Sequence, residues 1–411
     1  AGVGTYLFED ACENSALRPT TVTEETVYEE LQALGSVFGV DVQPIINDMK
    51  ADFDQAAGLV SSSMSGAPLK TVWLDCVGRC CEVPEGHEEQ VFVGGGTGAP
   101  NMLMQEAGLS NVFSDRSGNW VCVNVSDVIA ADPDVIVVVD AAWDTAIDKI
   151  KWLYNDEEFC HLDVLRAARF VSIPFSATTL SPRNGPAALD LAVAALHVRT
   201  GSQTESRESG VSSFSPYFLQ YHTSCQLCPL SMQYVVYDDA TDSAQNYNLC
   251  TTTSTTPQPV TVTNCGVSNT LASAPTRAIT MNQGATEFLL AMGLEDSMVG
   301  TAYLDDAIWP KHAAAYATIP VLSSSYPNET HIMAQNPDFI VASYSSAFRA
   351  QYTTSSGKVR GIFTSETVGP CSGDGSDWGQ SWTTCRPQLH AAGVGTYLFE
   401  DACENSALRP T

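Results

Sequence analysis

The chain has 411 residues, and its 47 acidic side chains outnumber its 19 lysines and arginines, which gives a net charge of −28. This charge argues against nucleic acid or an anionic membrane as a partner, because both would repel it. No apolar run reaches the roughly 18 residues needed to cross a bilayer, so the sequence predicts no membrane-spanning helix. We expect any membrane tether, like any secretory signal, to lie outside residues 1–411.

Apolar runs and helical spacing predict alternating strands and helices along the chain. Residues 3–9 predict a short buried strand, and two helices open near Thr23 and Pro44. The next strands are predicted at 70–76, 90–93, 134–140 and 169–174, and the next helices at 100–107, 144–154, 160–167 and 187–198. Further strands are predicted at 277–281, 298–301 and 338–342, with helices at 285–292 and 329–335.

One pattern occurs twice, over residues 94–140 and again over 284–344. Each copy has a glycine-containing turn, a helix ending in Gly-Leu, a short helix, an Asp/Asn-Pro-Asp stop and a buried strand. The repeat predicts an α/β fold of two Rossmann-like lobes that face a ligand cleft. The lobes are expected at 63–199 and 277–391, joined by a Thr- and Ser-rich linker at 200–276.

Residues 1–20 recur unchanged as residues 392–411. The chain is therefore either a window cut from a tandem array or a rearranged chain. Only one copy can fill the last strand position of the lobe at 277–391. Because loop closure is shorter for the second copy, we expect 394–400 in that sheet and 3–9 displaced from it.

The cysteines predict disulfide bonds. There are 13, and since Cys12 and Cys403 are the same position in two copies, an even set remains. Disulfides are typical of an oxidising compartment. Cys371 with Cys385 is the clearest local pair. Further local pairs are Cys250 with Cys265, Cys225 with Cys228, and two among Cys76, Cys80 and Cys81. A zinc site at Cys225 and Cys228 is less favoured, since no second pair stands at zinc spacing.

Two sequons add to this picture, at Asn124 and Asn328. Each has a permissive middle residue, so both asparagines are predicted glycosylation sites. Together with the cysteines, they predict a secreted or cell-surface glycoprotein.

The segments RAITMNQGATEFLLAMGLEDSMVGTAY and GGGTGAPNMLMQEAGLSNVF carry a resemblance to a known family. They resemble the two lobes of helical-backbone binding proteins for ferric siderophores and cobalamin, which serve ABC importers. The resemblance implies that 277–391 is the first lobe and 63–199 the second. It also implies that 1–20 and 392–411 are crossover strands, and that 21–62 holds the inter-lobe helix and the one after it. The lobe order is therefore permuted or that of a tandem repeat.

The family resemblance implies capture of a metal chelate, with no catalysis and no cofactor. Aromatic faces would bury the chelate and arginines would bond its oxygens. We expect these groups in loops at the carboxyl ends of strands. The candidate ligand-binding residues are Arg79, Thr97, Asn101, Trp143 and Arg183 in one lobe, and Asn282, Gln283, Tyr303, Trp309, Tyr344 and Arg349 in the other. No metal ligand set is predicted.

The family's importer-docking glutamates have no acidic counterpart here, since their places fall on the sequon hydroxyls of Ser126 and Thr330. Glycans there would cover both docking faces, so docking on an ABC permease is not expected. The pattern is similar instead to algal surface siderophore-binding proteins that deliver by endocytosis. We predict a ferric siderophore of the hydroxamate type as ligand. Cobalamin or haem binding, a structural surface repeat, and an enzyme on a related lobe pattern stay open as alternatives.

Overall fold

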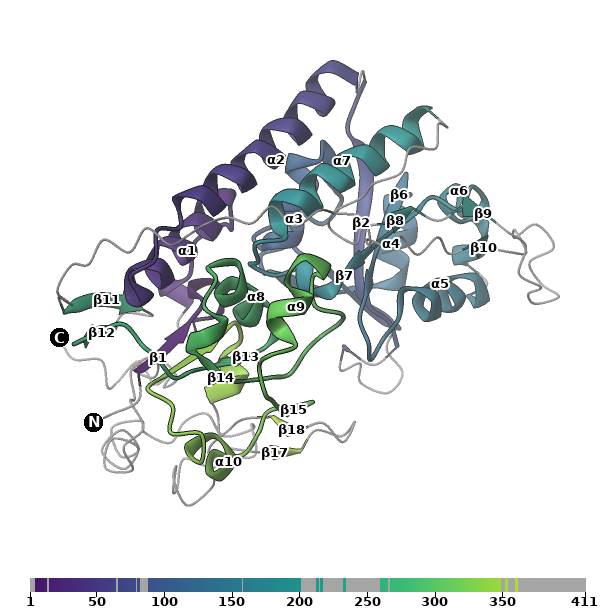
Figure 1. The fold of residues 1–411 in the computed structure, drawn as a ribbon. Coiled ribbons are helices and arrows are strands. Elements are labelled where there is room, and N and C mark those ends of the chain that lie inside the picture. The colour runs from purple at the N-terminus through teal and green to yellow at the C-terminus, as the bar shows by residue number, and fades with distance from the viewer. Residues whose placement is uncertain are drawn as a thin grey trace. The chain divides into compact units, whose positions relative to one another are not determined.

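The computed structural model describes residues 4–12, 15–63, 66–78, 80–81, 88–156, 158–200, 259–264 and 267–348, with short strands at 212–213, 215–216, 232–233, 352–353 and 359–360. The chain divides into two compact units (Figure 1). Unit 1 comprises Ala1–Pro19, Thr26–Ile45 and Ala244–Thr411, and unit 2 comprises Thr20–Glu25 and Ile46–Ser243. The predictions for Arg79, Arg349, Cys225, Cys228, Cys250, Cys265, Cys371, Cys385 and 392–411 lie outside the described residues.

Unit 1 is built on a parallel sheet with the strand order β1-β16-β13-β14-β15. The strands are β1 Gly4–Leu7, β13 Ala278–Met281, β14 Met298–Ala302, β15 Val321–Ser323 and β16 Phe339–Ala342. The helices are α1 Glu24–Phe38, most of which belongs to this unit, α8 Gln283–Ala291, α9 Ala313–Tyr316 and α10 Glu329–Met333. The central strands are buried throughout, because a parallel sheet is covered on both faces.

We predicted that residues 3–9 would be displaced from the sheet of the lobe at 277–391, and this prediction is wrong. Strand β1 pairs with β16 in parallel, from Gly4 with Phe339 to Leu7 with Ala342. The prediction considered only the cost of loop closure. It left out the hydrogen bonds that the first copy makes to α1, the helix that follows it. The Tyr6 hydroxyl donates to Glu30 Oε2 at 2.8 Å, and the Glu9 amide donates to Oε1 at 2.5 Å. These contacts with α1 are local to the first copy.

Unit 2 holds a mixed sheet with the order β5-β3-β2-β6-β7-β8, and β4 also pairs with β2. The strands are β2 Leu69–Cys76, β3 Gln90–Gly94, β4 Leu109–Asn111, β5 Trp120–Asn124, β6 Val135–Asp140, β7 Phe170–Pro174 and β8 Ser212–Ser213. Strands β2, β4, β6 and β7 are parallel, whereas β3 runs antiparallel to β2, and β5 antiparallel to β3. The reversal at β3 decides where the glycine-rich loop lies.

The helices of unit 2 agree with the predicted spans to within a few residues, except for the helix at 125–131, for which no span was predicted. They are α2 Gln43–Ser63 (in this unit from Ile46 on), α3 Ala99–Glu106, α4 Val125–Ala131, α5 Ala146–Asn155, α6 Asp163–Arg166 and α7 Asn184–Thr200. Valines and isoleucines of β2 and β6 pack against α5 and α6 in one apolar core. Among the described residues, no helix is long and apolar enough to span a membrane.

Three short antiparallel pairs complete the described structure: β9 Ser215–Pro216 with β10 Met232–Gln233, β11 Val260–Asn264 with β12 Val267–Leu271, and β17 Tyr352–Thr353 with β18 Val359–Arg360. The β11–β12 hairpin lies where the sequence predicted a linker. The Val-Thr-Val-Thr alternation of β11 suits a half-exposed strand. Asn264, the last residue of β11, forms two hydrogen bonds with Leu7 of β1. Its Oδ1 accepts from the Leu7 amide, and its Nδ2 donates to Leu7 O.

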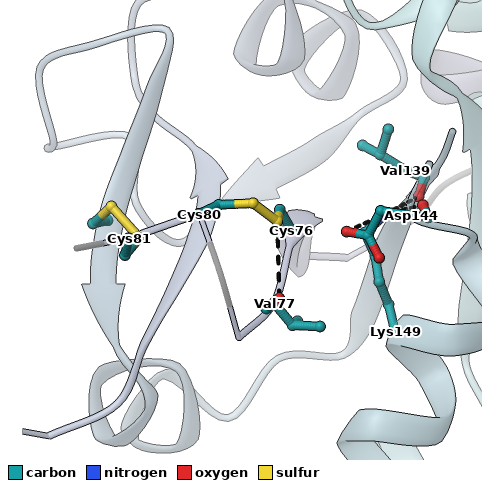
Figure 2. The surroundings of a disulfide bond; sticks show 8 residues. Cys76, Val77, Cys80, Cys81, Val139, Asp144 and Lys149 are labelled. Carbon is teal, nitrogen blue, oxygen red and sulfur yellow. Dashed lines mark hydrogen bonds and ion pairs between the residues drawn. A yellow bond between two sulfur atoms is a disulfide. The ribbon is translucent and has the colours of Figure 1, made fainter. Parts of the chain in front are cut away.

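Two disulfides join the described part of unit 2. Cys76, at the end of β2, is bonded to Cys80, and the neighbouring Cys81 is bonded to Cys122 of β5 (Figure 2). The prediction of a pair within the group Cys76, Cys80 and Cys81 is therefore confirmed. The two bonds hold the beginning of the loop after β2 at two adjacent residues.

Candidate ligand-binding site

The carboxyl ends of β2, β6 and β7 lie at one edge of the unit 2 sheet, because these strands are parallel neighbours. This is the edge at which open α/β sheets bind ligands. Asp75 precedes the last residue of β2, Asp140 is the last residue of β6, and Phe175 follows β7. The loop from Asp140 to Thr145 connects β6 to α5 and carries Trp143.

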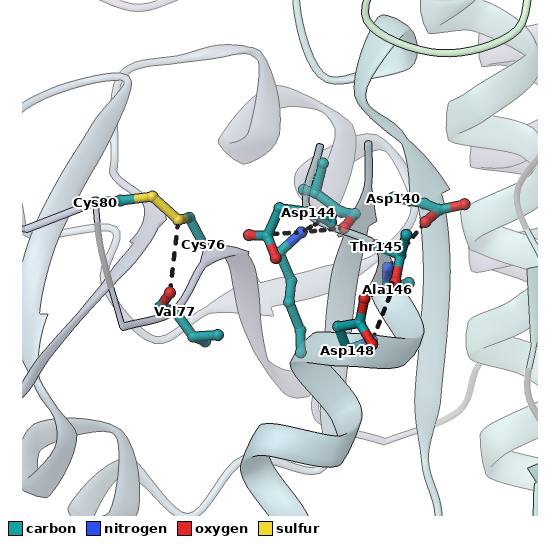
Figure 3. Close-up of polar contacts among 10 residues, drawn as sticks. Cys76, Val77, Cys80, Asp140, Asp144, Thr145, Ala146 and Asp148 are labelled. Carbon is teal, nitrogen blue, oxygen red and sulfur yellow. Dashed lines mark hydrogen bonds and ion pairs between the residues drawn. A yellow bond between two sulfur atoms is a disulfide. The ribbon is translucent and has the colours of Figure 1, made fainter. Parts of the chain in front are cut away.

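Trp143 lies on a tight turn that is closed by hydrogen bonds. The amide of Asp144 donates to Ala141 O at 3.1 Å, and the amide of Ala141 donates to Asp144 O at 3.3 Å. Asp140 Oδ1 accepts from the amide of Ala146 at 2.8 Å, so the turn is also tied to the start of α5 (Figure 3). A closed turn of this kind limits the positions that Trp143 can adopt.

The indole of Trp143 packs against Phe175 and is partly exposed. Its ring lies 5.2 Å from the ring of Phe175, at an interplanar angle of 68°. Even so, 43% of Trp143 is exposed, which makes it one of three exposed large apolar side chains in the described part of the chain. An edge-to-face pair of this kind supports an aromatic face that another molecule can cover.

Lys149 of α5 lies beneath this turn with none of its side chain exposed. Its Nζ donates to Val139 O at 2.7 Å and to Asp144 O at 2.6 Å, and lies 3.2 Å from Asp144 Oδ2. Burial lowers the pKa of Lys149, whereas the carboxylates of Asp144 and Asp75 raise it. The lysine charge is thus balanced inside the protein.

Asp75 completes this charged group from β2. Burial raises its pKa to about 7; Lys149 opposes that rise and Asp144 adds to it. Its Oδ1 is fully buried and accepts no hydrogen bond within the described part of the chain. Asp75, Asp144 and Lys149 therefore form a coupled group at the carboxyl edge of the sheet.

Arg183 lies in the loop after β7, as predicted, but only 3% of it is exposed. The loop folds around Asn184, whose Nδ2 donates to Ala177 O at 3.0 Å and to Thr179 O at 2.9 Å. The Arg183 amide donates to Ser181 Oγ at 3.0 Å. The predicted exposed arginine is therefore buried in this structure.

Thr97 lies in the glycine-rich loop after β3, which runs antiparallel to β2, and Asn101 lies in the first turn of α3. This loop does not follow a strand that ends at the edge described above. The Thr97 hydroxyl accepts from the amide of Gly118 at 3.2 Å, and Asn101 Oδ1 accepts from Asn111 Nδ2 at 3.2 Å. A Cβ at Gly96 would collide with Ser114 O, so the loop is shaped to pack against the chain.

At the carboxyl ends of the strands of the unit 1 sheet, two residues have unusual backbone conformations. Asn282 follows β13 with φ of 77°, and Tyr303 follows β14 with φ of 61°. Non-glycine residues rarely adopt positive φ, and such strain is concentrated at functional sites. The Tyr303 ring stacks on Tyr326 at 4.7 Å, and Asn282 Nδ2 donates to the Tyr326 hydroxyl at 2.9 Å.

Gln283 and Trp309 form hydrogen bonds with other residues of unit 1. Gln283 Oε1 accepts from the amides of Asp305 at 3.0 Å and Asp306 at 2.9 Å. Trp309 is 4% exposed; its amide donates to Glu287 Oε1 at 3.0 Å, and Lys311 Nζ lies 3.2 Å from its ring centre. Both side chains hold the loop after β14. Tyr344, which follows β16, is half-buried.

The two sequon asparagines differ in environment. Asn328 is exposed and caps α10, where its Oδ1 accepts from the amide of His331 at 2.8 Å. Asn124 is half-buried at the end of β5, and its Oδ1 accepts from Gln90 Nε2 at 2.9 Å. The bonded atom is the carboxamide oxygen in both, and glycosylation of either residue stays a prediction.

Sequence reasoning missed Asp75, Asp144, Lys149 and Phe175 as members of this edge. Asp75 could have been found, because a carboxylate in the apolar segment KTVWLDC must be buried or at the strand end. Lys149 could also have been found, because helical spacing places it on the same face as the apolar Ala146, Ile150 and Leu153. Among the described residues, no group of three or more His, Cys, Asp or Glu side chains could hold a metal ion.

No family model matches the chain, and no curated protein matches it. Among solved structures, a possible iron-binding periplasmic solute-binding protein from Staphylococcus epidermidis is 14% identical and covers 42% of this chain and 62% of its own, with a TM-score of 0.34. A periplasmic heme-binding protein from Pseudomonas aeruginosa is 16% identical, with 43% and 61% covered and a TM-score of 0.37. Nickel-bound CeuE from Helicobacter pylori is 15% identical, with 46% and 56% covered and a TM-score of 0.36. The chain spans less than two thirds of each of these proteins, and likenesses of this size do not assign it to a family.

Proposed function

We propose that this protein binds a small metal chelate, a ferric siderophore of the hydroxamate type, and catalyses no reaction. The observation that carries the proposal is the exposed Trp143 ring, held on a closed turn against Phe175 at the carboxyl edge of the unit 2 sheet. Such a surface can bury the partly apolar shell of a chelate. The resemblance of the sequence to siderophore-binding proteins supports the same class of ligand.

The charge of the protein favours a neutral or cationic chelate. The Trp143 turn carries Asp140 and Asp144, α5 adds the exposed Asp148, and the whole chain has a net charge of −28. Three hydroxamates neutralise Fe³⁺, whereas three catecholates leave a charge of about −3, and haem carries two propionates. Anionic ligands are repelled by like charge, and this repulsion is screened by salt.

The titratable groups at this edge are also better suited to a rigid binding surface than to catalysis. Lys149 is fully buried and bonded to the turn, and its charge is balanced by Asp75 and Asp144. A catalytic acid or base has to reach the atom that gains or loses the proton. The Lys149 ammonium instead bonds to the backbone and pairs with Asp144.

A titration with ligands of different charge tests the proposal. Ferrioxamine B is cationic through its terminal amine, and N-acetylation makes it neutral without changing the iron shell. The ligand panel would add ferric enterobactin as the anionic chelate, with haemin and cyanocobalamin as the rivals. We expect both ferrioxamines to quench the intrinsic tryptophan fluorescence saturably, the cationic form binding more tightly at low salt.

Two results would count against this function. Saturable binding of haemin or cyanocobalamin with no ferrioxamine binding would replace the ligand class. Binding of none of the five would favour the structural-repeat alternative. The iron-free ferrioxamines serve as controls, since they have the same charge on the terminal amine and lack the metal centre.

A further inference from the structure

We propose that Lys149 is the positioning residue of the site, which holds the Trp143 turn in the form that accepts the chelate. The inference rests on the proposed function, because it assigns Lys149 a role in presenting Trp143. Lys149 itself is fully buried and cannot touch a ligand in this structure. Its effect on binding would pass through the turn.

The first argument is geometric. The lysine ammonium donates two hydrogen bonds, to Val139 O and Asp144 O, and forms an ion pair with Asp144 Oδ2 at 3.2 Å. Val139 lies in β6, before the turn, and Asp144 immediately follows Trp143, so one charged group joins both ends of the segment that carries the indole (Figure 2). Without that group, the carbonyls of Val139 in β6 and of Asp144 in the turn would lose their bonds to Lys149.

The second argument concerns the choice of a lysine. Its neighbours on α5, Ala146, Ile150 and Leu153, are buried apolar side chains in the core of unit 2. An apolar residue at position 149 would pack there without the cost of burying a charge. The lysine is instead compensated by Asp75 from β2 and by Asp144 from the turn, with Asp140 adding a further favourable charge. A buried charge that is paired from two elements specifies one arrangement of those elements.

The third argument is the anchoring of the opposing carboxylate. Asp75 is followed directly by Cys76, which is disulfide-bonded to Cys80 (Figure 2). The end of β2 is therefore covalently tied to the beginning of the next loop. Asp75 thus contributes its charge to Lys149 from the end of a strand that is paired on both sides, with β3 and β6.

A double-mutant cycle tests this inference, with Lys149→Met, Trp143→Ala and the double variant. Ferrioxamine B affinity is measured by equilibrium dialysis, and folding is checked by urea denaturation. We expect Lys149→Met to lose about tenfold or more in affinity, and the double variant to lose no more than Trp143→Ala alone. Non-additive losses show that two residues act through one another. Losses that multiply would overturn the positioning role.

Two further measurements keep the test decisive. The acrylamide quenching that is due to Trp143, taken as the difference from Trp143→Phe, should rise in Lys149→Met without any ligand. If Lys149→Met does not fold, Asp144→Asn weakens the same contact and should raise the same quenching. Unchanged quenching in a folded variant would refute the inference. Failure of the parent protein to bind ferrioxamine would refute only the proposed function.

Discussion

Removal of the Trp143 side chain is the most direct perturbation of the proposed site. Because 43% of this residue is exposed and a tryptophan buries up to about 250 Å², a chelate that covers the ring would remove about 100 Å² from water. At about 25 cal/mol per Å², this area corresponds to about 2.5 kcal/mol. Trp143→Ala is therefore expected to raise the Kd for ferrioxamine B by up to about 60-fold.

Equilibrium dialysis with radioactive iron is the suitable assay, since its signal does not depend on the removed fluorophore. Trp143→Phe should fall between the parent and the alanine variant, because a smaller aromatic ring retains part of the contact. The matched control is Val321→Ala, which truncates another exposed apolar side chain, on β15 of unit 1. A change of less than about threefold for Trp143→Ala would refute the assignment of the indole to the binding surface.

Two predictions concern stability. Burial raises the pKa of Asp10 to about 7 against the opposing effect of Arg18, so its stabilising contribution is complete below about pH 4 and is lost as the pH rises through 7. The free energy of unfolding in urea should therefore fall between pH 5 and pH 8, and Asp10→Asn should reduce that fall; an equal fall in the variant would contradict the assignment. The two disulfides should differ in their contribution to the free energy of unfolding, because the cysteines of Cys81–Cys122 are 41 residues apart and those of Cys76–Cys80 only 4. Loss of Cys81–Cys122 by replacement of its two cysteines with serine should cost about 4 kcal/mol in the chain-entropy estimate, and the same change at Cys76–Cys80 about 2 kcal/mol. A larger loss for Cys76–Cys80 in urea denaturation would contradict this prediction.

The sequence by itself determined most of the secondary structure. The apolar run VIVVVD predicts a strand that is buried on both faces, and β6 is that strand. Helical spacing likewise predicted α5 and α7, and the predicted end of β2 agrees with the structure. These features follow from the local period and composition of the chain, which do not depend on the partner of each element.

Only the tertiary structure decided which side chains meet. Trp143 and Trp309 both follow strands and look equivalent in the sequence, yet one is 43% exposed and the other 4%. Their surroundings differ: the Trp143 ring packs edge-to-face on Phe175, whereas Lys311 lies over the Trp309 ring. Two identical copies of GVGTYLF have the same composition, so the sequence could distinguish them only by the length of the loop to the sheet. The hydrogen bonds of the first copy with α1 were not part of that estimate. The helical period places Lys149 on the apolar face of α5, but its partners, Asp75, Val139 O of β6 and Asp144 O of the turn, come from other elements and cannot be read from that period.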